Sequence, residues 1–203
     1  MSRNLATLLE QPPTPVLVPE SLLVTDAKPP LKWAGGKRWL VPHLRPIWED
    51  HAYRRLVEPF CGGLAITLGL RPQRALLNDI NPHLVNFYRW LRKGLLIEMP
   101  MKNAERHYYL ARARFNSLLA DGLIRTQEAA GLFYYLNRTG YNGLCRFNSQ
   151  GGFNVPFGRY QQINYVRDFS PYVEPFSRWA IQLLRLREVE PRTRRLCVRR
   201  SSL

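Results

Sequence analysis

The sequence predicts an α/β fold in which a small parallel sheet is joined to a mostly helical block. Two hydrophobic segments, residues 55–60 and 74–78, have the character of strands and flank a glycine turn and a short helix. A strand, a turn, a helix and a second strand make a βαβ unit, whose two strands run parallel. From residue 83 to residue 138 the apolar residues recur at helical spacing instead.

The elements of this fold have local start and stop signals. Gly35 and Gly36 form a loop that opens a helix, and Pro59 stands at the end of the first strand, where a missing N–H is tolerated. Asn81 followed by Pro82 is a typical helix start, because asparagine caps the first turn and proline fits the first helical position.

These signals divide the chain into four segments. We expect residues 1–29, which are rich in proline, to be a disordered leader and residues 30–82 to form the N-terminal part of the core. Residues 83–175 are expected to form the helical domain. Residues 176–203 begin a return to the core and then become rich in arginine.

The composition restricts the partners of this protein. A net charge of +15 over 203 residues favours a polyanionic partner such as DNA, RNA or an anionic membrane surface. No apolar run is long enough for a membrane span, and the first residues lack a signal-peptide pattern. The three cysteines, Cys61, Cys145 and Cys197, form no CxxC pair, and the histidines have no zinc-ligand spacing. We therefore expect a cytoplasmic protein without a metal site.

The segment from Asn137 to Tyr160 carries most of the functional information. It is rich in glycine, asparagine, arginine and tyrosine and has almost no aliphatic residues, so we expect it to bury no part of a core. A loop of this composition can present amides, guanidinium groups and aromatic faces to the edges of nucleic-acid bases.

A second group of residues surrounds the predicted βαβ unit. Gly62 and Gly63 follow the first strand and would let a ligand approach backbone N–H groups. Asp79 ends the next strand, where an acidic group holds ribose hydroxyls in dinucleotide sites. Trp33 offers a stacking face and Lys37 a cation. Each of these residues also has a purely structural alternative. The glycines could form a plain turn, and Asp79 could be a residue at a helix start. Trp33 could anchor the core, and Lys37 could be a solvated lysine.

Together these motifs resemble one family, the Dam-type (D12 class) DNA adenine-N6 methyltransferases. The resemblance extends from Lys32 to about Trp179. The motifs follow in the family's order: LKWAGGK, VEPFCGG, NDIN, LNRTGYNGLCRFN and GFNVPFGRY.

The resemblance implies a Rossmann-like S-adenosylmethionine-dependent methyltransferase core, incomplete in this chain, with an inserted mostly helical DNA-recognition domain. It implies that S-adenosylmethionine is bound by Trp33, Lys37, Phe60, Gly62 and Asp79. It also implies that duplex DNA is contacted by Lys32, Arg138, Tyr141, Asn142, Arg146 and Arg159.

The chemistry of these residues is consistent with that assignment. Arginine can bond guanine with two hydrogen bonds, asparagine can bond adenine, and tyrosine can fill a base step vacated by a flipped base. Of the basic residues, Arg146 is the strongest DNA-contact candidate, whereas Arg138 has the alternative of pairing with an acid. For Asn137 the alternative is a helix cap.

The family's Asp-Pro-Pro-Tyr tetrad, whose carboxylate and proline carbonyl accept the N–H bonds of the adenine amine, does not occur in these 203 residues. The arginine-rich tail is either a phosphate-binding arm or a segment read out of frame. Permitted codons for residues 192–203, shifted by one nucleotide, encode GRDDFVYADPP. We therefore expect a truncation or frameshift before this motif, after a slip near Trp179.

Three functions remain open at this stage. The leading one is adenine-N6 methylation of duplex DNA, with GATC as the family's commonest target, by an orphan or restriction-linked methylase. If the protein has this function, we expect it to be a monomer in a prokaryotic or phage-infected cell and to have no membrane partner. If it belongs to a restriction system, we also expect a companion endonuclease. The chain as given is expected to be weakly stable and to transfer no methyl group. The alternatives are a non-catalytic DNA-binding remnant and an RNA methylase.

Overall fold

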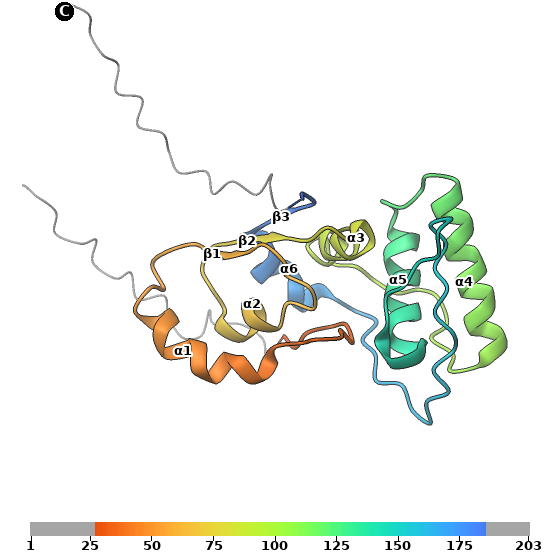
Figure 1. The fold of residues 1–203 in the computed structure, drawn as a ribbon, viewed down its shortest axis with the longest axis horizontal. Coiled ribbons are helices and arrows are strands. Elements are labelled where there is room, and N and C mark those ends of the chain that lie inside the picture. Colours follow the sequence, from red (N-terminus) through yellow and green to blue (C-terminus); the bar gives the residue numbers. More distant parts are fainter. Residues whose placement is uncertain (1–26, 186–203) are drawn as a thin grey trace, which may run out of the picture.

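The computed structural model of this protein describes residues 27–185. Most of the expected leader and the whole arginine-rich tail from residue 186 lie outside the described residues. Figure 1 shows the sheet with its helices on one side of the molecule and the long helices α4 and α5 on the other. In chain order the elements are η2 (Arg38–Leu40), α1 (Val41–Glu49), β1 (Leu56–Glu58), α2 (Ala65–Leu70), β2 (Ala75–Asn78), α3 (Pro82–Leu91), α4 (Glu105–Ala120), α5 (Gln127–Thr139), η3 (Tyr141–Gly143), α6 (Ser170–Ser177) and β3 (Trp179–Gln182).

The expected βαβ unit is confirmed. Strands β1 and β2 are parallel, with Val57 opposite Leu76, and helix α2 connects them. All four residues of β2 are buried, as expected for the central strand of a parallel sheet that is covered on both faces. Strand β1 is shorter than the predicted 55–60, because the chain turns away at Pro59.

The sequence did not predict the third strand. β3 adds in parallel to the other edge of β2, so that the strand order is β1-β2-β3. Asn78 extends this pairing, because its side chain accepts a hydrogen bond from Leu184 N and donates one to Leu184 O.

The predicted start of the helical block is also confirmed. Asn81 caps α3, because its side-chain oxygen accepts hydrogen bonds from the backbone N–H groups of His83 and Leu84 at 3.0 and 3.2 Å. Helix α3 packs against α5 and also against α6 and β3. It therefore joins the sheet to the helical block. Within residues 27–185 no helix has the length and apolarity that a bilayer crossing requires.

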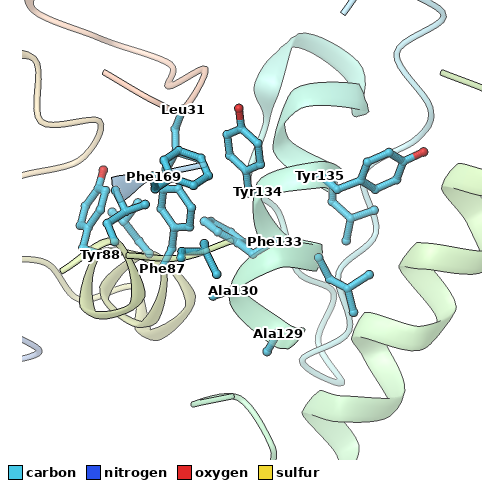
Figure 2. Packing of buried hydrophobic residues seen from close by; sticks show 14 of the residues in the cluster. Leu31, Phe87, Tyr88, Ala129, Ala130, Phe133, Tyr134, Tyr135 and Phe169 are labelled. Carbon is cyan, nitrogen blue, oxygen red and sulfur yellow. The ribbon is translucent and has the colours of Figure 1, made fainter. Parts of the chain in front are cut away.

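Aromatic packing makes the two parts one continuous core. Phe87 of α3 stacks on Tyr134 of α5 with ring centroids 5.6 Å apart and planes inclined by 5°. Phe169 packs edge-on against Tyr134 at 5.0 Å. Figure 2 shows these rings between α3 and α5, with Leu31 from the N-terminal segment against them. The sheet and the helical block are thereby held in a fixed relation.

One expectation about the segment 137–160 is wrong, because part of this segment does belong to the core. Phe153 and Val155 are buried, and Phe147 and Phe157 pack against the same cluster. A short antiparallel bridge joins Phe147 to Phe153. Phe153, Val155 and Phe157 lie inward at every second position, and Asn154 and Pro156 between them do not, so a segment without aliphatic runs is still anchored.

Candidate cofactor cavity and nucleic-acid interface

A cavity of about 250 Å³ lies where β1 and β2 end. In open α/β sheets the carboxyl ends of the strands are the usual place for a ligand. All five residues that the sequence assigned to the cofactor line this one cavity. The full lining consists of Trp33, Ala34, Gly35, Gly36, Lys37, Glu58, Phe60, Cys61, Gly62, Gly63, Ala65, Ile66 and Asp79.

Asp79 ties the two loops of the cavity together. One carboxylate oxygen accepts a hydrogen bond from Gly62 N at 3.0 Å, and the other accepts one from Asn81 N at 3.0 Å. The side chain is buried at 8% exposure. Each oxygen keeps a further lone pair, so Asp79 can bond a ligand while it holds the turn after β1 against the start of α3.

The glycines in this turn are required by Trp33. A Cβ on Gly62 would lie 2.9 Å from Trp33 Nε1, and a Cβ on Gly63 would lie 2.8 Å from Trp33 Cβ. Gly62 also has φ +44°, which side chains disfavour. Trp33 packs on the edge of the core and also lines the cavity, so its position is compatible with both roles that its sequence context leaves open.

One charged residue of the cavity, Glu58, is not predicted from the sequence. Glu58, the last residue of β1, lines it and accepts a hydrogen bond from the Thr67 hydroxyl. Burial raises the pKa of Glu58 above its usual value, although the Thr67 bond opposes that shift. A buried carboxyl group of this kind is suited to a positively charged ligand group. The neighbouring Cys61 thiol is a poor nucleophile, because burial raises its pKa.

The chemistry of the cavity fits part of a nucleoside-like cofactor that carries a positive charge. It combines two carboxyl groups, the ring of Trp33 and the ring of Phe60, which is 67% exposed. Its volume is somewhat below the range of roughly 300–1,000 Å³ typical for small-molecule pockets. The described residues therefore line enough space for a portion of such a molecule.

The polar residues of the 137–160 segment form an exposed basic surface. Tyr141, which is 50% exposed, and Asn142 stand on the turn η3, directly after α5. Asn142 has φ +50° and Arg159 has φ +51°, conformations that are uncommon outside glycine. Arg159 is exposed and lies 3.6 Å from Glu105. The backbone thus presents Asn142 and Arg159 at some conformational cost, which is common at functional positions.

Arg146 is held by a partner that the sequence analysis did not identify. Its Nε donates to Asn154 Oδ1 at 2.9 Å, and its Nη2 donates to Asn154 O at 3.3 Å. Asn148 closes the turn between them, since its side-chain oxygen accepts hydrogen bonds from Gln150 N and Gly152 N. The guanidinium group is therefore oriented and still has free donors on its exposed side.

Lys32 and Arg138 lie together at the junction with the cavity. Lys32 Nζ donates to Arg138 O at 3.3 Å and stands 3.5 Å above the ring of Tyr160. Arg138 Nη2 donates to Asn164 O. Arg138 therefore pairs with a backbone carbonyl group and not with the acid that the sequence suggests as an alternative partner. Burial, followed by the charge of Arg138, lowers the pKa of Lys32. Two cations held this close are suited to an anionic partner.

A parallel βαβ unit with a carboxylate at the second strand end, joined to a basic surface of amides and aromatic rings, is typical of a nucleotide-cofactor protein that acts on nucleic acid. The model of the family described as D12 class N6 adenine-specific DNA methyltransferase matches residues 33–170, and this chain belongs to that family.

Several curated proteins are similar to this chain. The Type II methyltransferase M1.LlaDCHI of Lactococcus lactis subsp. cremoris is 37% identical over 147 residues, which are 70% of this chain and 51% of that protein. A DNA adenine methylase of Vibrio cholerae is 41% identical over 140 residues (65% of this chain, 48% of that protein). The DNA adenine methylase of Escherichia coli K12 is 40% identical over 143 residues, with the same two shares. The chain thus spans about half the length of these relatives.

Proposed function

We propose that this chain binds S-adenosylmethionine in the cavity beside β1 and β2 and binds duplex DNA along the basic face of residues 137–160, as part of an adenine-N6 methyltransferase. One observation carries the proposal. The five residues that motif positions assign to the cofactor, though they come from three separate segments, line a single cavity. The residue immediately before Trp33 is Lys32, which lies against the basic face.

On the cofactor side, the residues present suit the chemistry of S-adenosylmethionine. When bound, this cofactor supplies an electrophilic methyl group on a positively charged sulfur. Glu58 would balance positive charge on the cofactor, and Asp79 would accept a ribose hydroxyl with the lone pairs that the two backbone N–H groups leave free. Trp33 and Phe60 would cover its apolar surface.

On the DNA side, the exposed donors suit the major groove. Arg146, oriented by Asn154, would bond O6 and N7 of a guanine. Tyr141 would stack in the base step that a flipped adenine vacates. Lys32, Arg138 and Arg159 would contact phosphates or base edges near it. We propose GATC as the recognised site, because it is the commonest target of the family to which this chain belongs.

The chain as given is proposed to transfer no methyl group, because its sequence holds no Asp-Pro-Pro-Tyr tetrad. The segment whose shifted reading frame encodes that tetrad, residues 192–203, lies outside the described residues. The sequence of the encoding DNA tests the frameshift proposal. A codon set that gives no Asp-Pro-Pro-Tyr in either shifted frame would contradict it.

The function itself is tested with the purified 203-residue chain. Calorimetric titration with S-adenosylmethionine and mobility shifts with GATC and scrambled duplexes should both report binding. Transfer of labelled methyl groups to the duplex should stay at background. Methylation by this chain would contradict the proposed inactivity, while tighter binding of an RNA of the same sequence would contradict the DNA assignment.

A second candidate, a non-catalytic DNA-binding remnant, differs on one point. It predicts sequence-specific mobility shifts without measurable binding of S-adenosylmethionine. The companion nuclease of a restriction system, which the family resemblance leaves open, stays a proposal. The similarity to a Type II methyltransferase supports it, and the neighbouring genes would test it.

A further inference from the structure

The loop that carries Trp33 is held in place from outside the cavity. This loop, residues 31–36, contains no helix or strand. Within it, Gly36 N donates to Trp33 O at 3.2 Å. The backbone groups of Lys32 are bonded instead by a side chain from the far end of α5. In Figure 1 this N-terminal segment reaches from α1 toward α5.

That side chain is Asn137, and it pairs with Lys32 as a neighbouring strand would. Its Oδ1 accepts a hydrogen bond from Lys32 N at 2.9 Å, and its Nδ2 donates to Lys32 O at 2.7 Å. The same Nδ2 donates to Gly143 O at 3.2 Å. Asn137 is 2% exposed, so water does not compete for these bonds. One amide thus connects the cofactor loop, helix α5 and the turn that carries Tyr141.

A second contact fixes the same place from the turn η3. Gly143 lies so close to Lys32 that a Cβ on it would stand 2.3 Å from Lys32 Cβ and 2.9 Å from Lys32 O. Gly143 has φ +61°, which glycine adopts without strain. The turn η3 therefore packs directly on the backbone of Lys32, one residue before Trp33.

We propose that Asn137 is a positioning residue for the cofactor: it fixes Trp33 over the glycine turn although it does not itself line the cavity. The inference rests on the proposed binding of S-adenosylmethionine. Trp33 packs against Gly62 and Gly63 on one side, and the loop's outer side is held by Asn137 and Gly143. When these contacts are lost, the loop that carries Trp33 is no longer fixed. Cofactor binding must then order this loop, which weakens the binding affinity.

The test compares two variants that release the loop from different sides with a matched control. N137A removes the side-chain amide that bonds the backbone of Lys32. G143A adds a Cβ on the turn η3 that would push Lys32 away. The control is N86A, because Asn86 is also buried in a helix and donates one hydrogen bond, to Thr126 O at 3.1 Å, away from the loop. Each full-length variant is titrated calorimetrically with S-adenosylmethionine, and its melting temperature is recorded.

Both loop variants should weaken S-adenosylmethionine binding on the order of 10-fold, as residues that orient a ligand-binding group commonly do. N86A should lower the melting temperature but keep the cofactor affinity within about 2-fold, since no term of the binding free energy changes. Wild-type affinity in a folded N137A or G143A protein would overturn the inference. Equal weakening in N86A would overturn it too, because general destabilisation would then account for the loss. The wild-type titration distinguishes these results from a failure of the proposed function. If the proposed function is wrong, the wild-type protein itself does not bind S-adenosylmethionine.

Discussion

The backbone N–H of Gly62 donates a hydrogen bond to the carboxylate of Asp79 at 3.0 Å, and this bond connects the turn after β1 to the end of β2. The two residues come from neighbouring parallel strands, whose ends meet at one edge of the sheet. The cavity therefore depends on Asp79 for its shape, whatever else this carboxylate binds.

Replacement of Asp79 by alanine should weaken S-adenosylmethionine binding by at least about 10-fold, since hydrogen bonds to a charged group contribute roughly 1.5–3 kcal/mol each. The measurement is a calorimetric titration at fixed salt. Asp121→Ala is the control, because Asp121 is an exposed carboxylate at the end of α4. An unchanged affinity in D79A would remove Asp79 from the cofactor site.

Replacement of Arg146 by lysine should reduce base discrimination more than overall DNA affinity. Lysine keeps the charge but loses the planar fork that Asn154 orients. Discrimination between a GATC duplex and one with its guanine replaced should fall by about 1–3 kcal/mol in mobility-shift titrations. Arg114→Lys, at an exposed arginine already paired with Glu128, should leave discrimination as it is. If R146K discriminates as well as the wild type, another residue reads the guanine.

Replacement of Arg159 by glycine should separate stability from DNA binding. Glycine accepts φ +51° without strain, and the exposed contact with Glu105 contributes little, so the unfolding free energy should stay within about 1 kcal/mol. The slope of log DNA affinity against log salt concentration should decrease by about 1, which corresponds to the loss of one phosphate contact. The measurements are urea unfolding and DNA titrations at several salt concentrations. A DNA affinity and salt slope equal to the wild type's would show that Arg159 makes no phosphate contact.

The stability of the protein should decrease between pH 7 and pH 5 because of His83. Its ring stacks on Phe147 at 4.7 Å and also packs against Phe115, and burial lowers its pKa from 6.5 to about 4. In this interval the unfolded chain binds a proton that the folded protein does not, so acid favours unfolding.

The unfolding free energy attributable to His83 should thus fall by about 1–2 kcal/mol from pH 7 to pH 5, and the full penalty is reached below pH 4. Urea titrations of the wild type and of His83→Phe at both pH values measure it, because phenylalanine keeps the stacking without the proton. The same pH dependence in both proteins would assign the effect to other groups.

The sequence predicted the parts of the fold that local chemistry controls. The strand–turn–helix–strand unit follows from hydrophobic runs separated by glycine, and the start of α3 follows from Asn81 and Pro82. The candidate cofactor residues are named by the family resemblance of their motifs, and only Phe60, Gly62 and Asp79 among them follow the end of a strand. By contrast, Glu58 was missed, because a glutamate at a strand end is an ordinary surface residue until the fold buries it.

The roles of asparagines were the least predictable from sequence. The sequence suggests a helix cap as the role of Asn137, whereas its bonds to Lys32 join residues 105 positions apart. Asn154 orients Arg146 across a turn whose geometry depends on Asn148. An amide side chain can bond any backbone it meets, so its partner is decided only when the chain has folded.

The sequence by itself determined the type of core, the ligand-bearing motifs and the basic character of the 137–160 segment, because these depend on residue type and local spacing. Only the tertiary structure decided that Phe153 and Val155 of that segment enter the core, that β3 joins the sheet, and that Asn137 links the loop before Trp33 to the turn η3. These features rest on contacts between distant segments, where burial and hydrogen bonding select one partner among many that the sequence permits.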